Sequence, residues 1–227
     1  MKIMFLGTGA ADWPIKPWEN MTEFRRLSSA IIDDTLLIDP GPQVIESMTT
    51  YGKDPANVKY IINTHPHGDH FRVETVNALQ ELGAEFIEFS HGDVKEIGKY
   101  TVYAYRANHS TCEKAVHFII TDGEKTIFYG LDGAWLMFEE VQGIKTHKPD
   151  FAVFDATIGD VEGDYRIFEH NNLNMVLEMQ KTLKPYIKQF SINHMARTLH
   201  TPQKQLEERM KPYDVIVAYD GLELEIQ

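Results

Sequence analysis

Hydrophobic residues fall along the chain in two patterns, short β-type runs and longer stretches with a helical period. Runs rich in β-branched and aromatic residues and bounded by turn residues predict strands. They span Lys2–Leu6, Ser28–Ile32, Leu36–Ile38, Val58–Asn63, Glu85–Phe89, Tyr100–Arg106, Ala115–Thr121, Thr126–Tyr129, Phe151–Phe154, Gln189–Asn193, Val215–Ala218 and Leu222–Ile226. The turn Asp122-Gly123-Glu124 between two of these runs predicts a β-hairpin.

Helical spacing of apolar residues appears between many of the predicted strands. In Val73–Leu82 the apolar side chains recur every three residues and lie near one face of a helix. The predicted helices span Gln43–Thr50, Val73–Leu82, Ala134–Val141, Asn172–Leu183 and Pro202–Met210. Strands interleaved with helices predict an α/β (α+β) fold in which two sheets pack face to face and helices cover the outer faces. We expect a single domain over residues 1–227.

Composition excludes several other classes of protein. Hydrophobic residues make up 43% and charged residues 25% of the 227 positions, which are ordinary globular values. No apolar run reaches the roughly 18 residues that span a bilayer, so we expect no membrane association. The apolar start Met1-Lys2-Ile3-Met4-Phe5-Leu6 is too short for a signal peptide. The single cysteine, Cys112, cannot form an intrachain disulfide, and a cytoplasmic location fits best.

The charge balance is strongly acidic. The chain has 34 Asp and Glu against 22 Lys and Arg, for a formal net charge of −12. Such a surface repels phosphate backbones at long range, so a general nucleic-acid binder is disfavoured. Bound divalent metal ions would offset part of this charge locally.

The densest chemical signal is the loop that directly follows the predicted strand Val58–Asn63. It reads Thr64-His65-Pro66-His67-Gly68-Asp69-His70. Three imidazoles and a carboxylate within six residues suit a metal such as Zn²⁺, which accepts nitrogen and oxygen ligands. His65 and His67 lie two apart in an extended chain, so they point the same way and can bind one ion. Asp69 and His70 follow the turn and can reach a second ion.

This loop resembles the hallmark of the metallo-β-lactamase superfamily, His-x-His-x-Asp-His after a core strand. Three further segments resemble its later ligand-bearing segments, in the same order: Ala107-Asn108-His109-Ser110, Phe128-Tyr129-Gly130-Leu131-Asp132-Gly133 and Phe190-Ser191-Ile192-Asn193-His194. The resemblance implies a first metal site of His65, His67 and His109, a second of Asp69, His70 and His194, and Asp132 as the bridge. It also implies a four-layer αββα sandwich, two divalent ions per chain and attack on the substrate by a metal-bound hydroxide.

This sequence lacks features of several branches of the superfamily, and these differences disfavour the reactions of those branches. The common class B β-lactamases have Cys in the second site, where this chain has Asp132, so β-lactam hydrolysis is disfavoured. The chain after His194 is too short for the C-terminal helical region of glyoxalase II. His67 is present and a flavodoxin domain is not, unlike in flavodiiron proteins. The remaining resemblance is to the phosphodiesterase branch, which includes the transfer-RNA 3′-processing endonucleases and the phosphoribosyl cyclic phosphodiesterase.

Two segments resemble the proton-donating part of that branch. Phe154-Asp155-Ala156-Thr157 looks like the His-Glu-Ala-Thr segment of the endonucleases, and Phe168-Glu169-His170-Asn171-Asn172 resembles their Gly-His segment. The resemblance implies that His170 donates a proton to the leaving oxygen and that Asp155 holds its imidazole in one tautomer. Asp69 is expected to take part in catalysis as well. Arg197, whose planar guanidinium suits phosphate oxygens, and His200 are expected to bind substrate.

The sequence therefore favours a binuclear metal-dependent hydrolase, most specifically a phosphodiesterase acting on a small, open or cyclic organic phosphodiester. The endonucleases carry a long Gly- and Pro-rich arm, and no such insertion lies between Asp132 and His170, so nucleic acid is not the expected partner. Two alternatives stay open, an acyl hydrolase for thioesters, lactones or lactams on the same metal centre, and a metal-binding module without catalysis.

The remaining expectations concern the metal ion and the tryptophan and histidine side chains outside the motifs. Zn²⁺ is the expected metal, and Mn²⁺ and Fe²⁺ accept the same ligand types. The aromatic residues Trp13, Trp18 and Trp135 are expected to be exposed, either in a homodimer face or in a lid over the substrate. His91, His117 and His147 match no motif, and we expect them to be structural.

Overall fold

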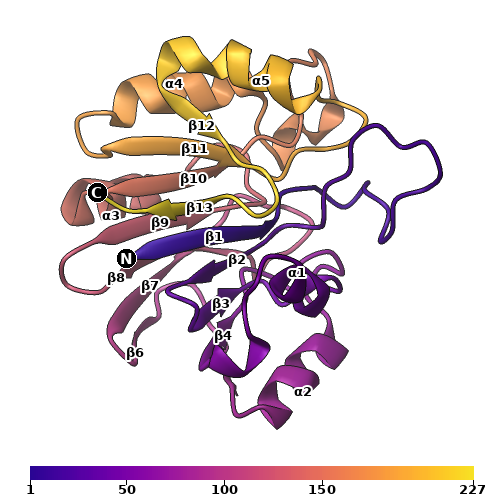
Figure 1. Ribbon diagram of the computed structural model, residues 1–227. Helices are drawn as coiled ribbons and strands as arrows, with labels where there is room; N and C mark the ends of the chain where they lie inside the picture. The colour runs from indigo at the N-terminus through magenta and orange to yellow at the C-terminus, as the bar shows by residue number, and fades with distance from the viewer.

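The computed structural model describes residues 1–227 and contains two β-sheets with helices outside them (Figure 1). The strands are β1 (Lys2–Gly7), β2 (Ser29–Ile32), β3 (Leu36–Ile38), β4 (Tyr60–Ile62), β5 (Glu85–Phe86), β6 (Val94–Ile97), β7 (Tyr100–Arg106), β8 (Val116–Thr121), β9 (Thr126–Gly130), β10 (Phe151–Asp155), β11 (Gln189–Asn193), β12 (Val215–Val217) and β13 (Glu223–Glu225). The α-helices are α1 (Val44–Thr50), α2 (Val73–Glu81), α3 (Phe138–His147), α4 (Leu173–Leu183) and α5 (Gln203–Met210). Three 3₁₀ turns, η1 (Pro55–Asn57), η2 (Tyr165–Phe168) and η3 (Lys211–Tyr213), complete the regular structure.

Each sheet combines antiparallel and parallel pairs. One has the strand order β13-β1-β2-β3-β4-β5, and the other has the order β12-β11-β10-β9-β8-β7-β6. The hairpin expected around Asp122-Gly123-Glu124 is the antiparallel pair β8–β9. Strands β9 to β12 pair in parallel, and such strands are covered on both faces. All five residues of β10 are accordingly buried, whereas β7 alternates between buried and partly exposed residues.

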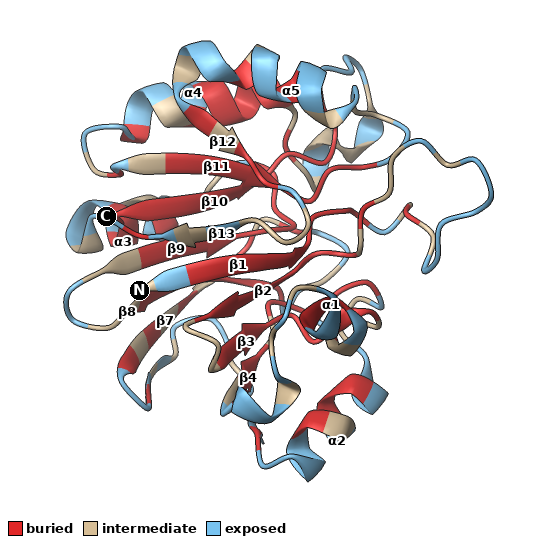
Figure 2. Ribbon diagram, in the orientation of Figure 1, coloured by how far each residue is buried: buried red, intermediate tan, exposed pale blue.

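Three apolar layers hold this arrangement together (Figure 2). Side chains from both sheets, among them Phe5 and Phe118, form the central layer. Helices α1 and α2 pack on the outer face of the first sheet through residues such as Met48 and Leu79. Helices α3, α4 and α5 cover the outer face of the second sheet. The αββα sandwich expected from the sequence is therefore confirmed.

Helix α3 differs from its prediction. The pattern predicted Ala134–Val141, but the helix spans Phe138–His147. The segment before it forms a turn in which Asp132 and Trp135 have positive φ angles of 55° and 51°, so a helix cannot include them. Inside the helix, a Cβ added at Gly143 would lie 2.5 Å from the Tyr105 ring, so close packing against β7 requires glycine there.

Two other expectations were wrong in part. Strand β6 was not predicted, because its sequence Val-Lys-Glu-Ile is largely polar and it lies at the edge of its sheet. Trp13 was expected to be exposed but is 8% exposed, and its Nε1–H donates to the Met195 carbonyl at 2.7 Å. Trp18 and Trp135 are exposed, at 52% and 46%.

The connections of the sheets position the functional residues. Strands β7, β9, β10 and β11 run in one direction, so their carboxyl ends lie at the same edge of the second sheet. Loops at such an edge are the usual place for ligand sites in α/β folds. No helix in the structure is both long and apolar enough to cross a membrane.

Candidate metal centre

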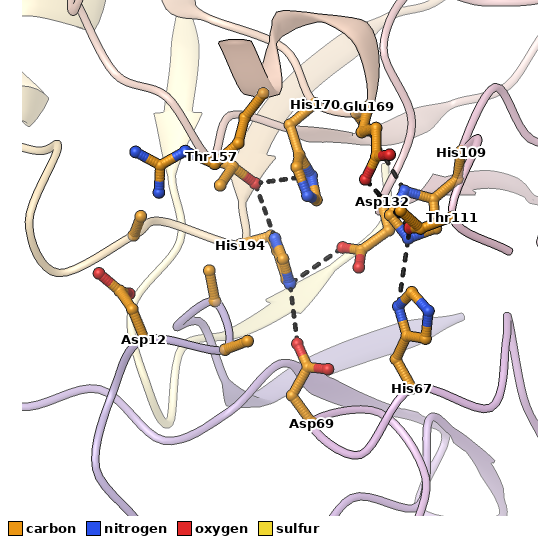
Figure 3. Close-up of a pocket in the computed structure, with 14 residues that line it drawn as sticks. Asp12, His67, Asp69, His109, Thr111, Asp132, Thr157, Glu169, His170 and His194 are labelled. Carbon is orange, nitrogen blue, oxygen red and sulfur yellow. Dashed lines mark hydrogen bonds and ion pairs between the residues drawn. The ribbon is translucent and has the colours of Figure 1, made fainter. Parts of the chain in front are cut away.

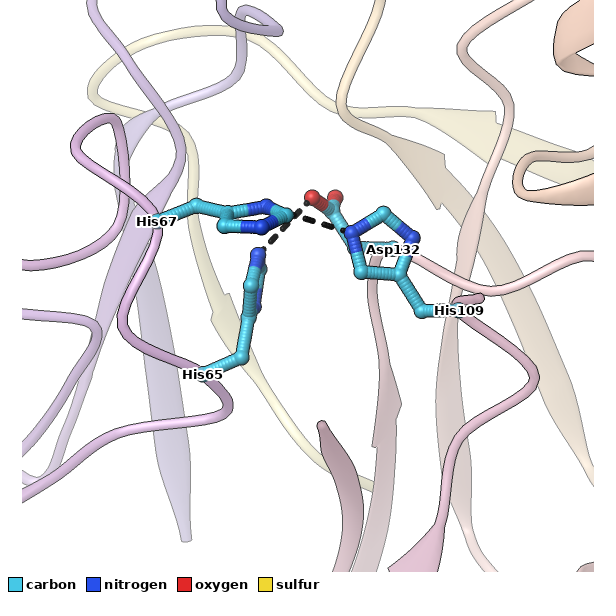
Figure 4. A group of neighbouring side chains, drawn as sticks. All are labelled: His65, His67, His109 and Asp132. Atoms are coloured by element: carbon cyan, nitrogen blue, oxygen red, sulfur yellow. Dashed lines mark hydrogen bonds and ion pairs between the residues drawn. The ribbon is translucent and has the colours of Figure 1, made fainter. Parts of the chain in front are cut away.

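Seven side chains from four segments of the chain form two adjoining groups at this edge. The first group contains His65, His67, His109 and Asp132 (Figure 4). The second contains Asp69, His70, Asp132 and His194. Within each group the possible ligand atoms lie within 4.8 Å of one another, and Asp132 belongs to both. The loop after β4 supplies four of these residues, and the others follow β7, β9 and β11.

The contacts inside the groups test whether cations fit there. His67 Nδ1 lies 3.2 Å from His109 Nε2, and His70 Nε2 lies 3.1 Å from His194 Nε2. His65 Nε2 is buried and lies 3.2 Å from Asp132 Oδ2, without a well-aligned hydrogen bond (Figure 4). Buried ring nitrogens that face one another are unfavourable unless a proton or a cation binds them. The nitrogen and carboxylate donors therefore fit divalent ions of the zinc type.

Hydrogen bonds from outside the groups orient the imidazoles. Asp39, which lies directly after β3, accepts from His70 Nδ1 at 2.9 Å and from the backbone N–H of Thr64 at 2.7 Å. The Thr157 hydroxyl accepts from His194 Nδ1 at 2.8 Å. In both imidazoles this leaves Nε2 directed into the group, as in metal sites where a second contact fixes the ligand tautomer.

The carboxylates of the groups carry negative charge into a buried site. Burial raises the pKa of the Asp132 carboxyl, but His194 and His70 lower it by more, so the net pKa is well below its ordinary value. Burial lowers the pKa of His194, but Asp132 raises it by more, to about 10. The Asp132 carboxylate is therefore ionised, and an ionised carboxylate favours cation binding.

A buried imidazole–carboxylate pair adjoins the two groups. His170 Nδ1 donates to Asp155 Oδ2 at 2.8 Å, and Asp155 is fully buried. Asp155 also accepts from the backbone N–H groups of Thr157 and Asn171, each at 3.0 Å, and of Asp132 at 3.2 Å. Burial lowers the pKa of His170, but the Asp155 carboxylate raises it by more. The segment that resembles the endonucleases thus places His170 and Asp155 together.

An open cavity of about 220 Å³ joins these parts (Figure 3). His170 and Asp69 line it, as do His67, His109, Asp132 and His194. Three charged residues that the sequence did not single out also line it: Asp12, Arg166 and Glu169. Asp39 supports the centre and was missed as well, although the polar sequence Asp39-Pro40-Gly41 directly after a buried strand was a usable signal.

The two residues expected to bind substrate do not line the cavity. The Arg197 guanidinium lies 5.2 Å from the Trp18 ring centre, and its Nε–H donates to the Asp12 carbonyl at 3.2 Å. His200 Nε2 donates to the Ala156 carbonyl at 2.5 Å, behind the turn after β10. Burial lowers the pKa of His200 to about 4, so its ring is neutral at pH 7. Both side chains stabilise loops, and Arg166 is the cation at the cavity.

Comparison with known proteins places the chain among metallo-hydrolase folds. Residues 28–72 match the family model described as the metallo-beta-lactamase superfamily. The metallo-beta-lactamase fold protein YhfI from Bacillus subtilis is 17% identical, with a TM-score of 0.76 over 98% of each chain. A diphosphatase of the PhnP family is 17% identical, with a TM-score of 0.75 over 100% of this chain and 98% of that one.

Human tRNase Z, short form, is 18% identical, with a TM-score of 0.72 over the whole of both chains. No curated protein sequence matches the chain. At these identities a structural likeness shows the fold. Together with the match of residues 28–72, it confirms the resemblance to the metallo-β-lactamase superfamily. The chain thus has a metallo-hydrolase fold with His/Asp clusters able to bind metal.

Proposed function

We propose that the chain is a binuclear metal-dependent phosphodiesterase that hydrolyses a small organic phosphodiester. The observation that supports this most strongly is the position of His170. Its Nδ1 is held by the buried Asp155, and its ring lines the same cavity as the two His/Asp groups. A proton donor beside paired cation sites is the arrangement that departure of an alkoxide from phosphorus requires.

The seven side chains would hold two divalent ions. His65, His67 and His109 would bind one, Asp69, His70 and His194 the other, and Asp132 would contact both. When bound, such a pair supplies Lewis acids that activate water and stabilise charge on the phosphoryl group. Zn²⁺ fits this ligand set best, and Mn²⁺ or Fe²⁺ would also be accepted.

The chain's own residues would manage the proton. Because Nδ1 of His170 donates to Asp155, Nε2 is the nitrogen available to the cavity. The Asp155 carboxylate raises the pKa of His170, which favours the form with a proton on Nε2, and the leaving oxygen would take that proton. Asp155 cannot turn away, because three backbone N–H groups also hold its carboxylate. Asp69 lines the cavity and would contact the reacting group as well.

The size and charge of the site favour a small substrate over a nucleic acid. The cavity of about 220 Å³ is smaller than the roughly 300–1,000 Å³ of sites for drug-sized ligands. The net charge of −12 opposes the approach of a polyanion. We therefore infer a low-molecular-weight phosphodiester as the partner of this site.

The test combines elemental analysis of the purified protein with a substrate screen. We expect two metal ions per chain and hydrolysis of bis(p-nitrophenyl) phosphate. Asp132→Ala should lower the metal content towards one ion per chain, because its carboxylate contributes to both groups. The variant Glu81→Gln, which removes an exposed charge on α2, is the control and should keep both ions.

Two results would contradict the proposal. Turnover of thioester or lactone substrates without any phosphodiester turnover would assign acyl chemistry to the centre. Two tightly bound ions in Asp132→Ala would show that Asp132 does not bridge them.

A further inference from the structure

The 3₁₀ turn η2 has two different faces at the rim of the cavity. In a 3₁₀ turn, residues three apart lie on the same side, because there are three residues per turn. Arg166 and Glu169 are three apart, and both line the cavity. Tyr165 and Phe168, also three apart, are 79% and 75% exposed. The turn therefore directs one cation and one anion to the cavity and leaves its aromatic side chains outside.

Arg166 is held in a fixed orientation. Its Nε and Nη2 donate to the two carboxylate oxygens of Asp164, at 2.8 and 2.6 Å, in a paired fork geometry. Asp164 also accepts from the backbone N–H of Arg166 at 2.9 Å. Nη1 has no hydrogen-bond partner within the chain, so it is free to donate to an anionic oxygen in the cavity.

Glu169 forms no ion pair with a lysine or arginine, and its carboxylate lies within 4.8 Å of ring nitrogens of His109 and His170. Its carboxylate accepts from the hydroxyls of Ser110 at 2.7 Å and Thr111 at 3.0 Å. These donors belong to the loop that carries His109, so they fix the carboxylate against the centre. Glu169 directly precedes His170, and both line the cavity. A bound substrate is therefore close to both the Glu169 carboxylate and the proton donor.

The other carboxylates of the lining have different partners. Asp69 and Asp132 belong to the candidate metal groups. Asp12 accepts from the backbone N–H groups of Arg197 at 2.8 Å and Thr198 at 3.1 Å. Arg166 and Glu169 are thus the cation and the anion that η2 and the residue after it place at the cavity.

We propose that Arg166 and Glu169 select the substrate by charge. Arg166 binds a non-reacting oxygen of a phosphodiester with one negative charge. Glu169 repels diesters whose organic groups carry a second negative charge, and it tolerates neutral or cationic groups. This inference rests on the proposed function, and it deepens it by naming the substrate class as singly charged phosphodiesters.

A matched pair of substrates tests the selection. Ethyl p-nitrophenyl phosphate and 2-carboxyethyl p-nitrophenyl phosphate share a leaving group and differ by one carboxylate. We expect the wild-type kcat/KM to favour the ethyl ester by about tenfold or more, since a nearby like charge in a partly exposed site costs on the order of 1–2 kcal/mol. Glu169→Gln keeps the shape of the side chain and should reduce this preference about fivefold.

Two further variants separate local from general charge effects. Glu81→Gln removes the same charge from an exposed position on α2 and should leave the preference unchanged. Arg166→Gln should raise KM for both esters about tenfold, because both lose the same contact. High salt should narrow the wild-type preference, since partly exposed charges are screened.

A binding measurement distinguishes this inference from the proposed function. Calorimetric titration of the metal-loaded protein with diethyl phosphate and 2-carboxyethyl ethyl phosphate, two diesters without an activated leaving group, gives the binding ratio separately from turnover of the p-nitrophenyl esters. An unchanged ratio in Glu169→Gln, in turnover and in binding, would overturn the selection while leaving phosphodiester hydrolysis intact. A fivefold change in the binding ratio without any phosphodiester turnover would support the selection and overturn the proposed function. Binding of neither phosphate would overturn the selection.

Discussion

Two imidazole–carboxylate pairs contact the turn at Leu131 and Asp132, and only one of them reaches the cavity. In the first pair, His170 Nδ1 donates to Asp155 at 2.8 Å. In the second, His117 on β8 donates through Nδ1 to Glu140 on α3 at 2.5 Å. In each pair burial lowers the pKa of the imidazole, and the partner carboxylate raises it by more.

The two pairs differ in what the second ring nitrogen, Nε2, contacts. His117 Nε2 donates to the carbonyl of Leu131 at 3.0 Å, so both nitrogens are occupied within the protein. His170 lines the cavity, and its Nε2 is left for a substrate. Both imidazoles are paired with a carboxylate, but His117 is structural and His170 is the candidate proton donor.

Both pairs also hold the turn that presents Asp132. The backbone N–H of Asp132 donates to Asp155, and the preceding carbonyl of Leu131 accepts from His117. Asp132 has a φ of 55°, a conformation that non-glycine residues adopt only when their surroundings hold them. The two pairs thus stabilise the carboxylate shared by both metal groups from either side.

The largest expected effect is the loss of activity when His170 is replaced. His170→Ala should lower kcat for a dialkyl phosphodiester, whose alkoxide leaves poorly without a proton, by about 10²–10⁴-fold, the usual contribution of a general acid, and leave the metal content at two ions per chain. His91→Ala, at an exposed loop position, is the matched control and should retain full activity. Wild-type kcat in His170→Ala would remove His170 from the reaction.

Removal of the other imidazole should affect folding instead. His117→Gln leaves Glu140 as a buried carboxylate without its cationic partner and should lower the free energy of unfolding by about 3 kcal/mol. Urea denaturation measures this change, and kcat per folded molecule should fall far less than in His170→Ala. The double variant His117→Leu/Glu140→Leu should recover part of the lost stability, because it removes both charges.

The variant Asp155→Asn tests the role of the carboxylate that holds His170. The amide should weaken the orientation of His170 and lower kcat about 10–100-fold, the range expected when a supporting contact is lost. Metal analysis decides its role, because Asp155 is not among the seven candidate ligands. Loss of an ion in Asp155→Asn would make its contact with the Asp132 turn, rather than with His170, its main contribution.

The pH dependence of stability gives the smallest effect. The pKa of His117 is raised in the folded protein, so the charged imidazole favours folding. This contribution is fully present below the ordinary value of 6.5 and is lost as pH rises through the raised pKa. The stability difference between wild type and His117→Gln should therefore shrink as pH rises, and an increase would contradict a charged His117.

Much of the site could be predicted because its residues occupy short segments that follow strands. The loop after β4 contains three histidines and an aspartate within six residues, and His109, Asp132 and His194 each follow a predicted strand. Arg166 and Glu169 gave no such signal, since a charged residue in a polar segment is usually a surface residue. Asp39 has the local signal of a polar residue directly after a buried strand, but its contact with His70, 31 positions away, depends on the tertiary structure.

The alternation of strands and helices and the residue types of the candidate centre followed from the sequence alone, because both depend on neighbours along the chain. Which imidazole is open to the cavity and which is enclosed depended on the packing of distant segments. His117 and His170 differ in what their second nitrogen meets, Leu131 in one case and the cavity in the other. That difference arises from where β8, α3 and the loops after β9 and β10 come to lie in space.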